Sequence, residues 1–182
     1  ERNASVYYNI FAMPTAGHSG GVASGTEAYH SFNVGNIHFV NLDSYGTSRS
    51  ATGAMANWLR SDLAANALPW VIAFWHHPPY SKGSHDSDSE TELVEMRQNF
   101  LPILEQYGVD LVLGGHSHSY ERSFLLDGHY GNSSTLTAAM KKNGGSGRED
   151  GTGAYTKPAG IVGRQGAVYA VPGSSGSTSG GS

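Results

Sequence analysis

Two short apolar runs, separated by one amphipathic helix, constrain the fold of this chain more than any other feature. The runs are WVIAFW (70–75) and VDLVLGG (109–115), and each has the length and side chains of a buried strand. Residues 91–107 between them are predicted to form a helix that ends at Gly108 and kinks or splits at Pro102. A right-handed strand–helix–strand crossover then brings the ends of both strands to the same edge of a parallel sheet.

The rest of the chain continues this alternation. The first thirty residues have mixed polarity and end in AGHSGGVASGTEAYHS, which reads as irregular loop, and order weakens again after Tyr120 until the last predicted strand. The further expected elements are a hairpin with its turn at Gly35 and Asn36, a helix over 51–66 capped by Ser50 or Thr52, and a strand over 166–173. The pattern predicts an α/β fold with a largely parallel sheet whose strand 70–75 is buried on both faces.

Composition excludes several classes of protein. The length of 182 residues suits one domain over 1–182, with a Gly/Ser-rich end at 174–182. A net charge of −4 gives no basic footprint, so we expect no nucleic-acid partner. No apolar run has membrane-spanning length, and no N-terminal stretch resembles a signal peptide, so we expect no membrane partner. Without cysteine, disulfides and thiolate metal sites are impossible.

Histidines follow both central strands at the point where each strand ends. His76 and His77 come directly after the first strand, and His116 and His118 follow the second. Because ligands gather at the carboxyl ends of parallel strands, we expect these imidazoles to meet and hold a metal ion. In an extended segment residues i and i+2 point to the same side, so His116 and His118 should face one centre or two adjacent ones.

Other candidate ligands have simpler interpretations. Asp43 ends a predicted strand and would face the site or, in the alternative, only shape a turn. The acidic residues at 86, 88, 90 and 92 are expected to be solvated charges near a helix start. We expect ordinary surface or core roles for the remaining hairpin-region histidines, which are His18, His30 and His38.

The histidine blocks resemble those of calcineurin-like metallophosphoesterases. FWHHPPYSKGSHDSD followed by GVDLVLGGHSHSYERS is similar to the later part of that domain, and GHSHSYERS is most similar to its purple acid phosphatase branch. The resemblance implies a four-layer αββα sandwich with mixed sheets, of which this chain would form a part. It also implies hydrolysis of phosphate esters by a metal-bound hydroxide, two metal ions (Fe, Zn or Mn) and, weakly, an exported or extracellular location.

The resemblance also implies roles for individual residues. His76 and His116 resemble ligands of one metal ion, and His118 resembles a ligand of the other. His85 lies where the branch keeps a histidine that binds phosphate and protonates the leaving group, so it is the expected general acid. Residues expected to support or position these groups are His77, Tyr120, Glu121 and Arg122.

The chain departs from the family pattern at its front. The early D-x-H, G-D and G-N-H motifs are missing, and Asp127-Gly128-His129 is a D-x-H triplet in the wrong order, which we interpret as a chance match. Without a bridging carboxylate, neutral imidazoles do not easily hold two dications close together, so one ion or none is expected here.

The missing front leaves alternatives to an enzyme. They are a non-catalytic metal- or phosphate-binding module and a fragment that is active only with its missing N-terminal segment. Sheet edges left uncovered would invite self-association.

Overall fold

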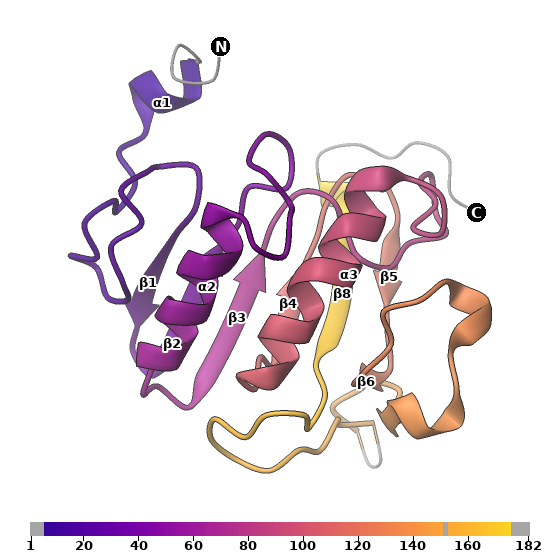
Figure 1. Ribbon diagram of the computed structural model, residues 1–182. Helices are drawn as coiled ribbons and strands as arrows, with labels where there is room; N and C mark the ends of the chain where they lie inside the picture. Colours follow the sequence, from indigo (N-terminus) through magenta and orange to yellow (C-terminus); the bar gives the residue numbers. More distant parts are fainter. Residues whose placement is uncertain (1–5, 151–152, 176–182) are drawn as a thin grey trace.

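The computed structural model describes residues 6–150 and 153–175, which fold around one six-stranded mixed sheet (Figure 1). The strand order is β1-β2-β3-β4-β8-β5; β2, β3, β4 and β8 are parallel, and the edge strands β1 and β5 are antiparallel to their neighbours. The strands of this sheet are β1 (His30–Val34), β2 (Ile37–Asn41), β3 (Trp70–Phe74), β4 (Leu111–Leu113), β5 (Tyr120–Arg122) and β8 (Val168–Pro172). The helices are α1 (Val6–Ile10), α2 (Ala54–Ala65) and α3 (Thr91–Gln106).

The predicted alternation is confirmed, with corrections at the element ends. The β1–β2 hairpin turns at Gly35 and Asn36, and Gly35 has φ +59°, which glycine adopts at little cost. The predicted cap of α2 is wrong, because Gly53 is its N-cap and no side chain caps it. The predicted split of the second long helix is also wrong, since α3 continues through Pro102.

The sequence reasoning missed several short elements. Residues 6–10 form α1, where no element was predicted, and β5 begins at Tyr120, where order was expected to weaken. A small second sheet pairs β6 (Leu125–Leu126) with β7 (Lys141–Asn143), and single 3-10 turns lie at Ser133–Thr135, Ala138–Met140 and Gly173–Ser175. From residue 176 onward the predicted Gly/Ser-rich end lies outside the described residues. No helix in the described ranges is long and apolar enough to span a bilayer.

The core lies between the sheet and the two long helices. Both α2 and α3 lie against one face of the sheet, side by side (Figure 1). Their apolar stripes meet the side chains that alternate strand residues turn toward them. Buried members of this core include Met55, Leu59, Leu63, Met96, Phe100, Val40, Val71, Ala73, Val112 and Tyr169. Each large apolar side chain removed from water here contributes about 2 kcal/mol to folding.

A buried carboxylate ties α3 to β8. Glu105 is almost fully enclosed and accepts hydrogen bonds from the hydroxyls of Tyr130 and Tyr169, both 2.6 Å, and from the backbone N–H of Gly128, 2.8 Å. Burial raises the pKa of Glu105, and these three donors oppose that rise. The network fixes the C-terminal end of α3 against the sheet.

The opposite face of the sheet differs from the prediction. Strand 70–75 was expected to be buried on both faces, but Trp70 is 51% exposed and Ile72 and Phe74 are only half-buried. The physical reason is that α2 and α3 cover one face alone. The half-buried side chains form two cross-strand rows, which are Phe39, Ile72, Leu111 and Val168, and Phe74, Leu113 and Ala170.

Candidate metal centre

Histidines from the ends of two adjacent parallel strands meet at one edge of the sheet. β3 and β4 pair in parallel, so His76 after β3 and His116 after β4 emerge side by side. His76 Nε2 lies 3.0 Å from His116 Nδ1, and their ring centroids are 4.9 Å apart. Two nitrogens bound to one tetrahedral zinc ion lie about 3.3 Å apart, given Zn–N bonds of about 2.0–2.1 Å. The spacing therefore fits two ligands of one ion.

Backbone geometry sets the direction of His116. It has φ +61°, a left-handed conformation that is uncommon for a residue with a Cβ and often marks a functional position. Just before it, Gly114 approaches Pro78 so closely that a Cβ on residue 114 would lie 2.8 Å from the Pro78 Cβ. The Pro-rich loop after β3 and the glycine loop after β4 are thus in direct contact.

His77 joins the meeting point from the buried side. One ring nitrogen from each of His76, His77 and His116 lies within 4.8 Å of the others, and we call these three residues the strand-end cluster. The Nδ1 of His77 is 2.9 Å from Ser44 Oγ, which also accepts its backbone N–H. Burial, followed by the nearby His116 and His76, lowers the pKa of His77 to about 4. His77 therefore stays neutral, the state in which imidazole binds metal.

A second group of ligand atoms surrounds the other side of His116. His85 Nδ1 is 2.8 Å from Glu90 Oε2, and that oxygen is 3.6 Å from His116 Nε2. The His85 and His116 rings stack with centroids 3.6 Å apart. We call His85, Glu90 and His116 the loop cluster; their ligand atoms also lie within 4.8 Å of one another.

Sequence reasoning missed Glu90. It was grouped with the solvated acidic residues, but it is the N-cap residue of α3 and accepts the backbone N–H of Asp86 as well as bonding His85. Burial tends to raise the pKa of Glu90, but these hydrogen bonds and the nearby His116 outweigh it, and the pKa is lowered. The available signal was its place at a helix start, five residues after His85 in a strand-end loop.

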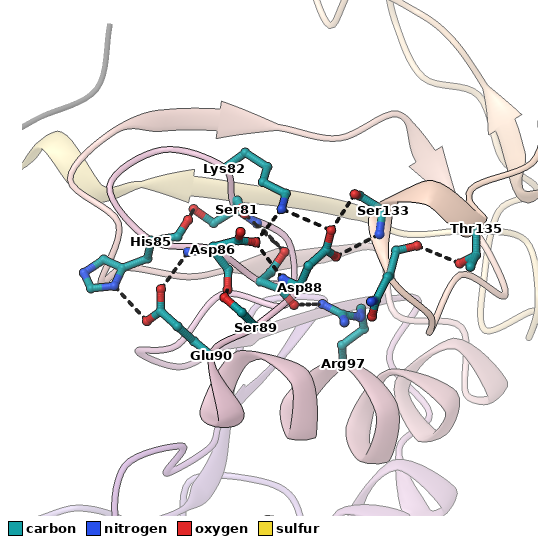
Figure 2. A network of polar contacts seen from close by, with 12 residues as sticks. Ser81, Lys82, His85, Asp86, Asp88, Ser89, Glu90, Arg97, Ser133 and Thr135 are labelled. Atoms are coloured by element: carbon teal, nitrogen blue, oxygen red, sulfur yellow. Dashed lines mark hydrogen bonds and ion pairs between the residues drawn. The ribbon is translucent and has the colours of Figure 1, made fainter.

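Polar contacts hold the loop that carries His85. Figure 2 shows a chain of contacts from His85 and Glu90 through Asp86 and Lys82 to Asp88 and Ser133. The Lys82 ammonium pairs with both Asp86 and Asp88, and Asp88 also accepts the Ser133 backbone N–H. The loop is therefore ordered by its own charges.

Glu121 connects the two histidine loops. Its carboxylate accepts hydrogen bonds from the Ser81 hydroxyl, the Lys82 backbone N–H and the hydroxyls of Ser117 and Ser119. Burial tends to raise the pKa of Glu121, but these donors outweigh it and lower the pKa. Ser117 stands between His116 and His118, so Glu121 fixes the loop that bears them.

The structure does not bring His118 into either cluster. Its backbone N–H donates to Ser84 Oγ, and its side chain is exposed. The left-handed turn at His116 means that the segment is not extended there, which is the geometry on which the expected common direction of His116 and His118 rested. His118 still lies near enough to His76 for its charge to help lower the pKa of His76, after burial, His116 and His85.

Other expected residues lie apart from both clusters. Tyr120 is 69% exposed on the edge strand β5. Arg122 donates to the Ser146 carbonyl and lies over the Tyr155 ring. Asp43 has the turn role, accepting hydrogen bonds from the backbone N–H groups of Tyr45 and Gly46 and from the Thr47 hydroxyl.

The D-x-H triplet belongs to neither cluster. His129 stacks on Tyr80 and lies 3.1 Å from the Asn132 carbonyl, and Asp127 is near Lys142 and Arg164. Among the hairpin-region histidines, His38 and His30 are buried, and His38 bonds Asp62 at 2.7 Å.

The residues present fit one divalent transition-metal ion. The strand-end cluster offers imidazole nitrogens at ligand spacing, and burial lowers the pKa of both His76 and His116, which favours their neutral, metal-binding form. It contains no carboxylate to bridge two ions. Next to it, Tyr7, Tyr8, Asp43 and Trp75 help line a cavity of about 750 Å³ at the strand ends.

Comparisons with known proteins give a matching family model and several similar relatives. Residues 2–120 match the family model described as calcineurin-like phosphoesterase. Purple acid phosphatase 15 of Arabidopsis thaliana is 38% identical over 121 residues, which cover 64% of this chain and 21% of that protein. Purple acid phosphatase 23 of the same plant is 40% identical over 120 residues, covering 64% of this chain and 24% of that protein. The chain thus spans less than a quarter of the length of these relatives.

A solved structure supports the fold. The purple acid phosphatase PPD1 from yellow lupin (Lupinus luteus) seeds matches with a TM-score of 0.57 and 17% sequence identity, over 85% of this chain and 23% of that one. At this identity the match concerns the fold alone, and it agrees with the mixed α/β architecture predicted from the sequence.

Proposed function

This chain belongs to the calcineurin-like phosphoesterase family, and on that premise we propose that it takes part in metal-dependent hydrolysis of phosphate esters. The observation that carries the proposal is the 3.0 Å approach of His76 Nε2 to His116 Nδ1 at the ends of adjacent parallel strands. Relatives named purple acid phosphatases share 38–40% identity with the chain and support the same reaction class.

The proposed metal ligands are His76, His116 and His118. The first two already stand at ligand spacing, and His118 lies near enough for its charge to act on His76. A bound Fe, Zn or Mn ion supplies Lewis acidity, which activates water and offsets the charge that develops on the phosphate oxygens. His77 lies beneath these residues, and its contact with Ser44 orients its ring.

His85 is the proposed proton donor to the leaving oxygen. The His85 ring is about one-third exposed beside His116, where substrate can reach it, and imidazole is the side chain that most often acts as a general acid. Glu90 holds its Nδ1, so Nε2 is the nitrogen available for proton transfer. Glu121 holds the loops together, and Tyr120 and Arg122 would contact substrate only at the outer rim.

The test combines metal content with hydrolysis of p-nitrophenyl phosphate. We expect about one metal ion per chain, a rate above that of buffer, and loss of both in His76→Ala and His116→Ala. His18→Ala, which changes an exposed histidine distant in sequence from His76 and His116, is the matched control. Undiminished hydrolysis in the His76→Ala, His116→Ala double variant would refute the proposal.

A second candidate is a metal-binding module that hydrolyses nothing by itself, or a piece that is active only with a preceding segment. Two observations favour it: the strand-end cluster has no bridging carboxylate, and two rows of apolar side chains lie half-buried on the open face of the sheet. It predicts one bound metal ion per chain with no rate above background. An exported location, phosphate-ester substrates and self-association at the sheet edges stay predictions.

A further inference from the structure

The two ring nitrogens of His116 face different groups. Nδ1 points to His76 in the strand-end cluster at 3.0 Å, and Nε2 lies 3.6 Å from Glu90 Oε2 in the loop cluster. The left-handed backbone at His116 holds the ring between them. A single imidazole therefore stands between two separate sets of potential metal ligands.

The loop cluster has the chemistry of a zinc site. It combines two imidazoles with a carboxylate, a donor set that suits Zn²⁺ and similar ions. Its measured spacings, 2.8 Å from His85 Nδ1 to Glu90 Oε2 and 3.6 Å from there to His116 Nε2, bracket the value of about 3.3 Å between ligand atoms on one tetrahedral ion. The carboxylate also supplies the negative charge that the strand-end cluster lacks.

An ion can reach the loop cluster from solvent. The side chains of His85, Glu90 and His116 are 32%, 34% and 24% exposed, so none is sealed in the core. The supporting loop is held in place by the Lys82 pairs (Figure 2), and Ser84 bonds across to the His116 loop through Ser117. The ligands are thus both accessible and positioned.

We propose that His85, Glu90 and His116 form a second divalent-cation site, which competes with the strand-end cluster for His116. A neutral imidazole has one free lone pair, so an ion bound through Nε2 leaves Nδ1 protonated and unable to bind a second ion. Occupation of one site therefore weakens the other. Resting on the proposed function, the consequence is regulatory: an ion in the loop cluster ties up the proton donor His85, and excess zinc inhibits hydrolysis.

The test is a Zn²⁺ titration of the full chain with ¹⁵N-labelled histidine, followed by NMR of the imidazole nitrogens. We expect the His85 ring signals to move to metal-bound positions as zinc is added. Glu90→Gln should weaken this zinc response at least about tenfold, the effect seen when a metal site loses a supporting carboxylate. The response of His76 and His77 should persist or strengthen. Glu92→Gln, two residues along the same helix start, is the control and should behave like the parent.

The outcomes separate this proposal from the proposed function, because no activity is measured. If zinc leaves the His85 signals unmoved, or if Glu90→Gln moves them as the parent does, the second site does not exist and the His85–Glu90 contact is only a hydrogen bond at a helix start. His85→Gln provides an independent check. It should fold as the control Glu92→Gln does, and it should lose zinc binding at the loop cluster as Glu90→Gln does. Circular dichroism of each variant verifies that α3 is intact.

Discussion

Acidification should destabilise the protein through His77. The side chain is only 5% exposed, and its pKa of about 4 lies well below the ordinary value of 6.5 for histidine. Burial is the main cause, followed by the neighbouring His116 and His76. In the unfolded chain His77 is in water and titrates near the ordinary value, so the two states bind different numbers of protons between pH 6.5 and 4.

The sign and size of this pH effect on folding stability follow from the two pKa values of His77. Below pH 6.5 the unfolded state binds a proton at His77 that the folded state does not bind. The contribution of His77 to folding stability is therefore fully present above pH 6.5 and is lost as the pH drops toward 4. The difference between 6.5 and about 4 corresponds to about 3 kcal/mol at this one residue. This is a large part of the 5–15 kcal/mol, roughly, that stabilises a typical domain.

Urea denaturation at pH 7, 5.5 and 4.5 measures the effect. We expect His77→Gln to lose about 1 kcal/mol at pH 7, because its contact with Ser44 changes, and to lose less than the parent as the pH falls. The stability curves of the two proteins should converge or cross. His18→Gln, which removes an exposed imidazole, controls for the loss of a histidine. If the parent and His77→Gln curves stay parallel down to pH 4.5, the reasoning is refuted.

Three further predictions concern stability and the site. Glu105→Leu leaves two tyrosine hydroxyls and a backbone N–H without their acceptor, and should cost about 3–5 kcal/mol in urea denaturation. Gly114→Ala places a Cβ 2.8 Å from Pro78 Cβ, so we expect a loss of about 1–3 kcal/mol and weaker zinc binding by calorimetry. On β3, Ile72→Asn should cost under about 1 kcal/mol, whereas Val71→Asn, whose side chain faces the helices, should cost several kcal/mol.

Each of these has a clear contrary result. A neutral Glu105→Leu would mean that the two hydroxyls find other partners. Zinc affinity unchanged in Gly114→Ala would show that contact between the two strand-end loops does not set the metal ligands. Equal losses in Ile72→Asn and Val71→Asn would show that the face bearing Ile72 is covered in solution.

Much of the site follows from sequence because it depends on regular structure. Parallel strands joined by a crossover helix must end at one edge, and this alone predicts that His76 approaches His116. The position of His118 could not be predicted in the same way. His118 follows a residue with a left-handed backbone conformation, His116, and its own backbone N–H bonds Ser84, and no pattern of residue types predicts either feature.

The predictions for Glu90 and for the second face of strand 70–75 were wrong for different reasons. The role of Glu90 depends on contacts with His85 in its own loop and with His116 in a loop distant in sequence, and its place at a helix start five residues after His85 gives a sign only of the first contact. Strand 70–75 has the continuous apolar character of a strand covered on both sides, which is a correct description of its composition. None of the described elements covers its second face, so the strand has the composition of a strand buried on both faces but is covered on one.

The two apolar rows across β2, β3, β4 and β8 decide how a solution of this chain should be handled. Their side chains are of the apolar kind found in a protein interior, yet they are partly in contact with water. Attraction between such surfaces weakens on cooling and grows stronger in sulfate or phosphate buffers. Cold, dilute, low-salt conditions should therefore keep the molecules apart, and concentrating them in ammonium sulfate should drive the open faces together.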